Sequence, residues 1–414
     1  MDRLTRIGGA ARPWVPLVVM VTLVQAVLAL MSRTLPIFGM PLTETGGMPP
    51  EAVGQLSSAT SFGSMVFFLW GPALLAGVQP LRQLQLGCAA AALAMLACAA
   101  GRWEGMLLAA FLIGLGYGPS APAGSDLLMR IVPRRRRATI FSIKQAGVPL
   151  GGLAAGLLLP AVAARFGGVT AALATASGLA LATAFALGFW SGTAESPASA
   201  RGAKPLHDLV LAPVRLLALV LSSPRLRLVT AAGFALGIAQ GIVMGFYPVF
   251  LSDHAGWSVA AAGAAFALLL GVGVPGRIVM GWLSDRMGEP VRAMAGLCFA
   301  SGLTMILLTT IGPNSSAAHV GLLSALAGLT VVSWNGVFLT GLAEAAPEGR
   351  VGEITAAGTF VLFSGYVVCP LIIQAVFTAT EGYTTGLLIS GAAPLLAGLA
   401  LIAGHVRHAS KPRA

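Results

Sequence analysis

Twelve runs of predominantly apolar residues, each about 20 residues or longer, follow one another along this chain of 414 residues. A helix of about 20 apolar residues is long enough to cross the hydrocarbon core of a bilayer. The sequence therefore predicts an all-α membrane protein with twelve transmembrane helices. The predicted spans lie near residues 14–38, 51–77, 81–100, 104–130, 138–164, 169–190, 226–251, 258–284, 292–312, 317–344, 352–378 and 384–404.

The composition excludes two other classes of protein. Hydrophobic residues make up 57% of the chain and charged residues only 9%, whereas about 25% charged residues are usual in soluble domains. A soluble protein of this size needs a polar surface that so few charged groups cannot cover. A disordered chain is rich in charge and poor in apolar residues. An ordinary soluble enzyme and a disordered protein are both excluded.

The basic residues indicate which side of the membrane each loop faces. If the N-terminus is cytoplasmic, the loops on that side hold 20 of the 25 Lys and Arg residues, and the opposite loops hold only Arg102 and Arg165. This asymmetry predicts a multi-pass protein of the bacterial inner membrane with both termini in the cytoplasm. The net charge of +11 is therefore explained by the topology, and no nucleic-acid partner is expected. The expected partners are a small-molecule substrate and the lipid bilayer, and the chain is expected to be a monomer.

The connection between the sixth and seventh spans divides the chain into halves. Its first part is polar. Its second part is apolar but interrupted by polar residues and a proline, which favours a helix lying at the cytoplasmic interface. A thirteenth span is the alternative, and it would place the C-terminus outside and break the charge asymmetry. We expect an N-terminal six-helix bundle, a cytoplasmic linker with an interfacial helix and a C-terminal six-helix bundle at 1–190, 191–225 and 226–414.

The two halves repeat each other in sequence. Several residues recur at a nearly constant shift of 210 to 214 positions. A constant shift in a chain with two sets of six spans is what a duplicated 6+6 transporter predicts. The matching pairs are Gly71 and Gly281, Pro80 and Pro290, Arg82 and Arg292, Cys88 and Cys298, Pro36 and Pro248, Phe38 and Phe250, Pro133 and Pro347, and Gly151 and Gly365.

The most specific motif follows the eighth span. The segment contains, in order, Gly281, Asp285, Arg286, Gly288 and Arg292. It resembles the signature Gly-x-Leu-x-Asp-Arg-x-Gly-x-x-x-Arg of the major facilitator superfamily. The resemblance covers all twelve spans and implies two six-helix bundles that rock about a site near the middle of the membrane.

In that motif, the glycines allow close helix contact, and the Asp and Arg can pair with neighbouring helix ends to latch the cytoplasmic side. Glu344, Arg350 and Glu353 flank the loop after the tenth span and are assigned to the same latch. The first-half copy departs from the pattern, because Leu75 and Ala76 stand where Asp and Arg are expected.

The fifth span begins with Lys144 and Gln145, followed by Gly147, Pro149 and Gly151. Its glycines and proline are similar to the motif of antiporters in the superfamily, but the proline stands one position late. The Lys-Gln pair with Gly-x-Pro-x-Gly-Gly also resembles bacterial permeases related to cyanate and organic-anion carriers.

Two cations lie deep in predicted spans. At a rise of 1.5 Å per residue, Lys144 lies about 10 Å beyond Arg137, and Arg277 lies about 12 Å before Asp285. A buried charge in a membrane helix costs about 2.5–3.5 kcal/mol and often marks a ligand route. We therefore predict that both cations attract an anionic substrate group, with Arg277 as a bidentate fork and Lys144 as a mobile point charge. Snorkelling to the cytoplasmic interface is the alternative for Lys144.

The resemblance adds to this prediction. In the superfamily the fifth and eighth spans oppose each other across a central cavity, which implies that both cations line it. Arg277 also resembles the anion-binding arginine of oxalate and monocarboxylate carriers of the superfamily.

Other polar residues within the spans complete the candidate site. Arg33 lies in the outer third of the first span, where it either helps to recruit an anion or snorkels outward. Asp126 is the only acidic residue well inside a span; it is a candidate for proton coupling, with Arg130 four residues on as its partner. The remaining candidates for the wall of the site, each of which can instead be a helix–helix contact, are Gln25, Tyr117, Gln240, Asn335 and Tyr366.

The sequence predicts a secondary transporter of a small organic anion, most plausibly a carboxylate, coupled to protons or to exchange. A proton-driven exporter of apolar or cationic compounds is the alternative within transport, and it would require an acid in the cavity. A membrane-embedded enzyme or sensor is the alternative of another class. It is disfavoured because the chain has no P-loop and no hydrolase motif. Gly271–Gly276 matches the glycine pattern of a dinucleotide-binding site, but it lies inside the eighth span and lacks the preceding strand that such a site needs. No metal or cofactor is expected.

Overall fold

The computed structural model describes residues 14–48, 52–98, 101–190 and 206–409. These residues are predominantly helical, and no strand occurs among them. The predicted all-α class is therefore confirmed.

Contacts within the chain divide it into two compact units. Unit 1 contains residues 1–134 and 143–212, and unit 2 contains residues 135–142 and 213–414. The helix Arg137–Phe166 thus contributes its first residues to unit 2 and the rest to unit 1. The domain boundaries at 190 and 225 stay predictions, since residues 191–205 lie outside the described part of the chain.

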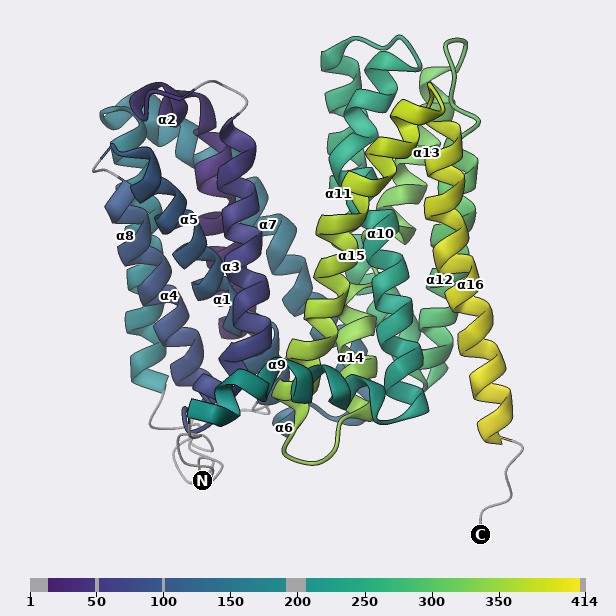
Figure 1. Cartoon of the computed structure of the whole chain (residues 1–414), viewed down its shortest axis with the longest axis horizontal. Coiled ribbons are helices and arrows are strands. Elements are labelled where there is room, and N and C mark those ends of the chain that lie inside the picture. Colours follow the sequence, from purple (N-terminus) through teal and green to yellow (C-terminus); the bar gives the residue numbers. More distant parts are fainter. Residues whose placement is uncertain (1–13, 49–51, 99–100, 191–205, 410–414) are drawn as a thin grey trace. The chain divides into compact units, whose positions relative to one another are not determined.

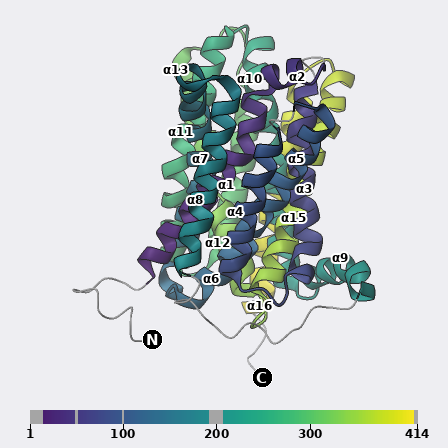
Figure 2. The ribbon, with the colours of Figure 1, turned by 90° about the vertical axis from the view of Figure 1, so that its left-hand side faces the viewer.

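Unit 1 is a bundle of helices that run side by side, joined by short turns (Figures 1 and 2). Proline opens or interrupts several of them, which is tolerated at a helix start because the first N–H groups have no partner within the helix. The helices are α1 (Val15–Ile37), α2 (Gly39–Thr45), α3 (Val53–Leu74), α4 (Pro80–Ala97), α5 (Trp103–Tyr117), the short 3₁₀ helix η3 (Gly118–Ser120), α6 (Pro122–Ile131), most of α7 (Arg137–Phe166) and α8 (Gly168–Trp190).

Unit 2 is a second helical bundle (Figure 1). Serine caps three of its helices by accepting a hydrogen bond from the backbone of the first turn. The helices are α9 (Leu206–Leu221), which begins in unit 1, α10 (Pro224–Asp253), α11 (Val259–Met287), α12 (Pro290–Leu308), α13 (Ala317–Thr330), α14 (Asn335–Ala345), α15 (Val351–Ala379) and α16 (Thr384–Ala409).

Each of the twelve predicted spans is helical, but ten helices among the described residues are long and apolar enough to cross a membrane by themselves. The other two are α3 and α4. Serine, threonine and glutamine side chains make α3 more polar, and α4 begins with Arg82, Gln83 and Gln85. Both helices still lie within their bundle, where contacts with neighbouring helices can accommodate such residues.

Two predicted spans are broken in the middle. The span at 104–130 consists of α5 and α6, joined by η3 and Ala121. The span at 317–344 consists of α13 and α14, joined by residues 331–334. These interruptions occur in the fourth and tenth spans, which are corresponding positions of the two halves. Corresponding broken helices in two repeats are a feature of transporter binding sites. We call them the first break (residues 118–121) and the second break (residues 331–334).

The same pattern of helix contacts recurs in both units. In unit 1, α3 packs on α5 and α4 packs on α8; in unit 2, α11 packs on α13 and α12 packs on α16. Matched residues from the sequence repeat occupy matching places. Gly151 of α7 packs against the backbone of α1, and Gly365 of α15 packs against the backbone of α10. The predicted internal duplication is therefore present in the packing of each unit.

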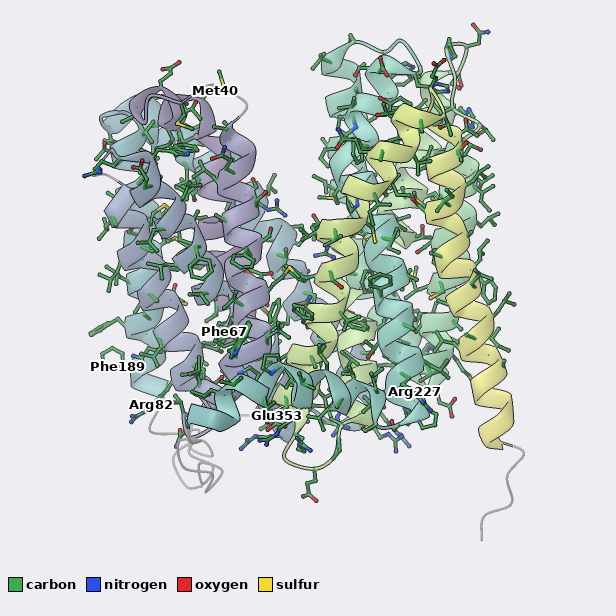
Figure 3. All side chains as sticks on the ribbon, in the orientation of Figure 1. Met40, Phe67, Arg82, Phe189, Arg227 and Glu353 are labelled. Carbon is green, nitrogen blue, oxygen red and sulfur yellow. The ribbon has the colours of Figure 1, made fainter. Side chains whose placement is uncertain are left out.

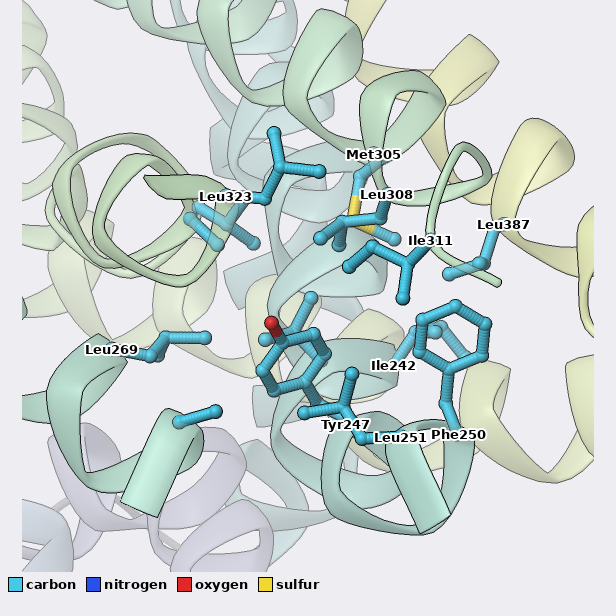
Figure 4. Close-up of a cluster of buried hydrophobic side chains, with 14 of the residues drawn as sticks. Ile242, Tyr247, Phe250, Leu251, Leu269, Met305, Leu308, Ile311, Leu323 and Leu387 are labelled. Carbon is cyan, nitrogen blue, oxygen red and sulfur yellow. The ribbon is translucent and has the colours of Figure 1, made fainter. Parts of the chain in front are cut away.

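The apolar interior of unit 2 shows how its helices are held together. Side chains from α10, α11, α12, α13 and α16 form one buried cluster (Figure 4), which includes Leu251, Leu269, Met305 and Leu308. The hydroxyl groups of Tyr247 and Ser324 form a hydrogen bond of 2.7 Å inside it, which satisfies the polar end of the tyrosine.

Helix α9 has 16 residues and is not among the helices that can span a membrane. In unit 2, Leu216 and Val220 of this helix pack against Ala357 of α15, and α9 runs across the direction of α15 (Figure 1). Its length therefore favours the predicted interfacial helix over a thirteenth span.

The labelled side chains show the two ends of each bundle (Figure 3). In unit 1, Met40 and Arg82 lie at opposite ends. In unit 2, Arg227 and Glu353 lie at the same end. Both observations agree with the loop sides predicted from the charges, whereas the side on which the termini lie stays a prediction because residues 1–13 and 410–414 are outside the described part.

The close crossing of α3 and α5 gives a test of the packing of unit 1. A β-carbon on Gly114 would collide with the backbone of Thr60, whereas one on Gly105 of the same helix would meet nothing within 4 Å. Overpacking at a tight contact costs about 1–3 kcal/mol. We expect Gly114→Ala to lower the thermal unfolding midpoint of the purified protein by several degrees and Gly105→Ala to leave it unchanged. Equal midpoints for the two variants would contradict this packing.

Candidate functional site

Lys144 lies inside unit 1 at the first break. Its side chain is 1% exposed, and its Nζ donates a hydrogen bond of 3.5 Å to the carbonyl oxygen of Ala121. Gly124 leaves the space for the ammonium group, since a β-carbon there would collide with the end of the lysine side chain. Within the part of unit 1 that the structure describes, no carboxylate oxygen lies within the 4.0 Å of an ion pair with Lys144.

The buried lysine therefore has a backbone dipole beside it and no counter-charge among the residues of its unit that the structure describes. The predicted alternative, snorkelling of Lys144 to the interface, is wrong for this structure, because the side chain is buried against the break.

Gln25 of α1 contacts the same break. Its side chain is 1% exposed, and its Nε2 donates to the hydroxyl of Tyr117 at 3.1 Å and to Oγ of Ser120 at 3.4 Å. Its Oε1 is buried without a hydrogen-bond partner among the described residues. Gly147 of α7 packs closely on α1 beside this glutamine. Three predicted site residues, Gln25, Tyr117 and Lys144, thus meet at the first break.

Arg277 of α11 contacts the second break in unit 2. It is 6% exposed, and its Nε donates a hydrogen bond of 3.0 Å to the carbonyl oxygen of Val332 in the second break. The hydroxyl of Ser333 donates to the carbonyl oxygens of Gly328 at 2.7 Å and Gly273 at 3.3 Å. These bonds tie α11 to the interrupted tenth span, and each break thus carries a buried cation from a neighbouring helix.

Two further predicted residues meet beside the second break. Nδ2 of Asn335 donates to Oε1 of Gln240 at 3.4 Å, and Oδ1 of Asn335 is buried without a partner in the described part of the chain. Gln240 follows Gln25 by 215 positions, and Asn335 follows Ser120 by 215 positions. The contact between Gln25 and Ser120 therefore recurs between their repeat equivalents, and the shift is close to that of the sequence repeat.

Other predicted wall residues lie apart from these contacts. Arg33 is exposed, and Gln145 and Tyr366 are half-buried. Tyr366 lies on α15, where its backbone packs on Gly237 and Gly241 of α10. These positions neither connect them to the breaks nor exclude them from a site.

Asp126 and Arg130 form the predicted pair on α6, with 2.8 Å between Oδ2 and an arginine Nη. The side chains are 19% and 41% exposed, so the pair contributes little, since partly exposed ion pairs stabilise by about 0–1 kcal/mol.

The signature motif holds the start of α7. Asp285 accepts hydrogen bonds from the backbone N–H of Ala138 at 2.9 Å, from the backbone N–H of Thr139 at 2.8 Å and from the hydroxyl of Thr139 at 2.5 Å. The first N–H groups of a helix have no partner within it and favour a negative charge. A β-carbon on Gly281 would collide with the backbone of Ala138, so the glycine allows this approach. The predicted role of the aspartate, contact with a neighbouring helix end, is present within unit 2.

The remaining motif residues act locally or support the same contact. Gly288 ends α11 in the left-handed conformation, with φ of 72°. Arg286 lies 4.7 Å from the ring centre of Trp282, a cation–π contact.

Three ion pairs involve the predicted gating residues. Arg137 lies 3.8 Å from Glu344, which ties the start of α7 to α14. Arg292 pairs with Glu289 at 3.0 Å, and Arg350 pairs with Glu353 at 2.6 Å. Glu344 therefore shares with Asp285 the task of holding α7, whereas Glu353 pairs within its own helix start.

Sequence reasoning missed the residues of the breaks themselves, namely Ser120, Ala121, Gly124, Val332 and Ser333. The sequence Gly118-Pro119-Ser120-Ala121-Pro122 carried a signal for the first break, because two closely spaced prolines interrupt a helix. The second break has no proline. Its only signal is the cluster of Ser333, Trp334 and Asn335 in an otherwise apolar run.

The comparison with known families shows to which family the chain belongs. The model of the Major Facilitator Superfamily matches residues 22–370. The chain belongs to the major facilitator superfamily. The resemblance stated from the motif of α11 is thereby confirmed, and the family is one of membrane transporters.

Relatives and solved structures agree with this assignment. An uncharacterized MFS-type transporter of Mycobacterium tuberculosis is 30% identical over 309 residues, which are 74% of this chain and 66% of that protein. This chain thus spans slightly less than two thirds of the length of that relative. The gentisate transporter of Corynebacterium glutamicum is 26% identical over 306 residues, 70% of this chain and 65% of that protein.

The crystal structure of the Escherichia coli fucose:proton symporter superposes with a TM-score of 0.75 at 13% identity. The superposition covers 94% of this chain and 99% of the symporter chain. At this identity the likeness supports the fold alone, and it confirms the superfamily fold for this transporter.

The bonds of Asp285 give a test in this transporter. Removing a side chain that caps a helix N-terminus costs about 0.5–2 kcal/mol. We expect Asp285→Ala to lower the thermal unfolding midpoint of the purified protein. Glu348, an exposed carboxylate in the loop before α15, supplies the matched control, and Glu348→Ala should leave the midpoint unchanged. If both variants unfold at the wild-type temperature, Asp285 does not hold α7 as described.

Proposed function

We propose that this transporter moves a small organic anion, a carboxylate, across the membrane by alternating access, driven by protons or by exchange for a second anion. The observation that carries the proposal is the burial of Lys144 without a carboxylate in the described part of its unit. The proposed membrane is the bacterial inner membrane, with both termini in the cytoplasm.

The electrostatics of Lys144 favour a negatively charged guest. A carbonyl oxygen 3.5 Å away offers only a dipole, and removing an ammonium group from water without a counter-charge is costly. A bound carboxylate would supply both the missing charge and a shorter, charge-assisted hydrogen bond. A cationic substrate would add a second positive charge to a buried one, which disfavours the exporter alternative.

Arg277 supports the same substrate class from unit 2. Its Nε is held by Val332, and this bond fixes the plane of the guanidinium group at the second break. A guanidinium held in one plane suits the two oxygens of a carboxylate. We propose that Arg277 orients the anion and that Lys144 attracts it.

The comparisons support an anion without identifying it. The relative in Corynebacterium glutamicum is named for gentisate, an organic anion. Its share of identical residues is low, so the name supports the substrate class only. For coupling of transport to protons, we propose that the carboxylate of Asp126 accepts the proton. The carboxylate becomes available when its ion pair with Arg130 opens.

Transport into proteoliposomes tests the proposal. Purified protein is reconstituted, and uptake of a panel of labelled carboxylates and organic cations is measured with and without a pH gradient, against protein-free vesicles. The proposal expects carrier-dependent uptake of carboxylates. Uptake of cations alone would replace it with the exporter alternative, and uptake of carboxylates without any effect of the gradient would support exchange over proton coupling.

Lys144 gives the sharpest variant. Breaking a buried charge pair costs about 2 kcal/mol or more, so Lys144→Met should reduce carboxylate uptake by about 30-fold or more. The same change removes a buried charge and should keep or raise the unfolding midpoint. Arg165→Gln, which alters an exposed cation of the same helix, serves as the control and should leave uptake unchanged. Normal carboxylate uptake by the Lys144→Met protein would remove this lysine from the site.

A further inference from the structure

Beside each break lies an amide side chain whose oxygen is buried and has no hydrogen-bond partner among the described residues. In unit 1 this atom is Oε1 of Gln25, whose side chain is 1% exposed. In unit 2 it is Oδ1 of Asn335. Buried acceptors are almost always hydrogen-bonded in proteins, because an unpaired one loses its bond to water without replacement. One such atom lies on each side of the repeated contact, on Gln25 in unit 1 and on the repeat equivalent of Ser120 in unit 2, and both call for an explanation.

The other atoms of these amides are already committed. Nε2 of Gln25 donates to Tyr117 and Ser120, and Nδ2 of Asn335 donates to Gln240. These bonds hold each amide plane and leave the oxygen as the remaining polar atom. What each oxygen lacks is a donor.

The chemistry of the missing donor follows from the cation beside it. Ser120, which binds Gln25, is followed directly by Ala121, whose carbonyl oxygen binds Lys144. A charged amine on a ligand that bound beside these adjacent residues would be repelled by the lysine ammonium. A neutral hydroxyl group carries a donor without that repulsion.

We infer that the substrate is a hydroxylated carboxylate, in which the carboxylate faces the buried cation and a hydroxyl group donates to Oε1 of Gln25. In unit 2 the available acceptor is Oδ1 of Asn335, which belongs to the other residue of the repeated contact. Gln25 thereby becomes a specificity-determining residue. The inference rests on the proposed function, because it refines the class of anion that the transporter carries.

Matched pairs of acids that differ by hydroxyl groups test this inference. Lactate is compared with propionate, mandelate with phenylacetate, and 2,5-dihydroxybenzoate with benzoate. Carrier-dependent uptake of each labelled acid into proteoliposomes is measured at neutral pH, with protein-free vesicles subtracted. A site built to bind a hydroxyl group rejects the analogue without it, so we expect wild-type protein to favour at least one hydroxy acid over its partner by about tenfold or more.

Variants of the two acceptors sharpen the test. Gln25→Met keeps the size of the side chain and removes the amide, so the preference for the hydroxy acid should fall by about tenfold. Asn335→Leu makes the corresponding change in unit 2 and gives an independent measurement if the first variant folds poorly. Gln85→Met removes an amide that donates to Ala184 elsewhere in unit 1, and it should keep the wild-type preference.

The outcomes separate the inference from the proposed function. Equal uptake of hydroxy acids and their partners by wild-type protein would overturn the inference and leave the carboxylate transporter standing. A preference that survives in both the Gln25→Met and Asn335→Leu proteins would also overturn it. Uptake of no carboxylate at all would overturn both. A preference that is lost in either acceptor variant and kept in Gln85→Met would support the assignment.

Discussion

The organisation of both units depends on interrupted helices whose backbone carbonyls bind buried cations. In a bilayer, irregular backbone is tolerated only where protein or a water-filled site satisfies its polar groups. Lys144 donates to Ala121 at the first break, and Arg277 donates to Val332 at the second. Each cation therefore stabilises an interruption of a helix, because it donates a hydrogen bond to a backbone carbonyl that the helix leaves free. The carbonyl in turn lowers the cost of burying the cation.

The two breaks reach the same arrangement by different local chemistry. In the first, Pro119 and Pro122 remove backbone donors, so the helix cannot continue with regular bonds. In the second, side chains compete with the helix for its carbonyls: Ser333 donates to Gly328, and the indole of Trp334 donates to Val331 at 2.8 Å. Only the first mechanism follows from the backbone alone, because proline has no N–H group to donate. The second depends on packing against α11, where Gly273 and Gly276 provide room for Val332 and Ser333.

This difference explains what could be predicted from the sequence. The number and order of helices, the duplication and the capping role of Asp285 followed from apolar runs and a motif. Lys144 and Arg277 stood out because charge is rare in membrane helices. The breaks did not stand out, because the runs at 104–130 and 317–344 are predominantly apolar by composition. Pairing of Gln25 with Ser120 and of Gln240 with Asn335 joins residues about a hundred positions apart, and no local pattern specifies such contacts.

The course of α7 links the candidate site to the signature motif. Residues 135–142 of the chain belong by their contacts to unit 2, and the chain from Ile143 onward belongs to unit 1. Lys144 follows Thr139 by five residues in the same helix, so about one and a half helical turns separate the buried cation from the backbone that Asp285 holds. A helix transmits displacement along its axis because its backbone bonds resist stretching within so short a distance. Under the proposed function, an anion that draws Lys144 away from Ala121 acts on the same helix that Asp285 and Glu344 hold, which gives substrate occupancy a physical route to these contacts.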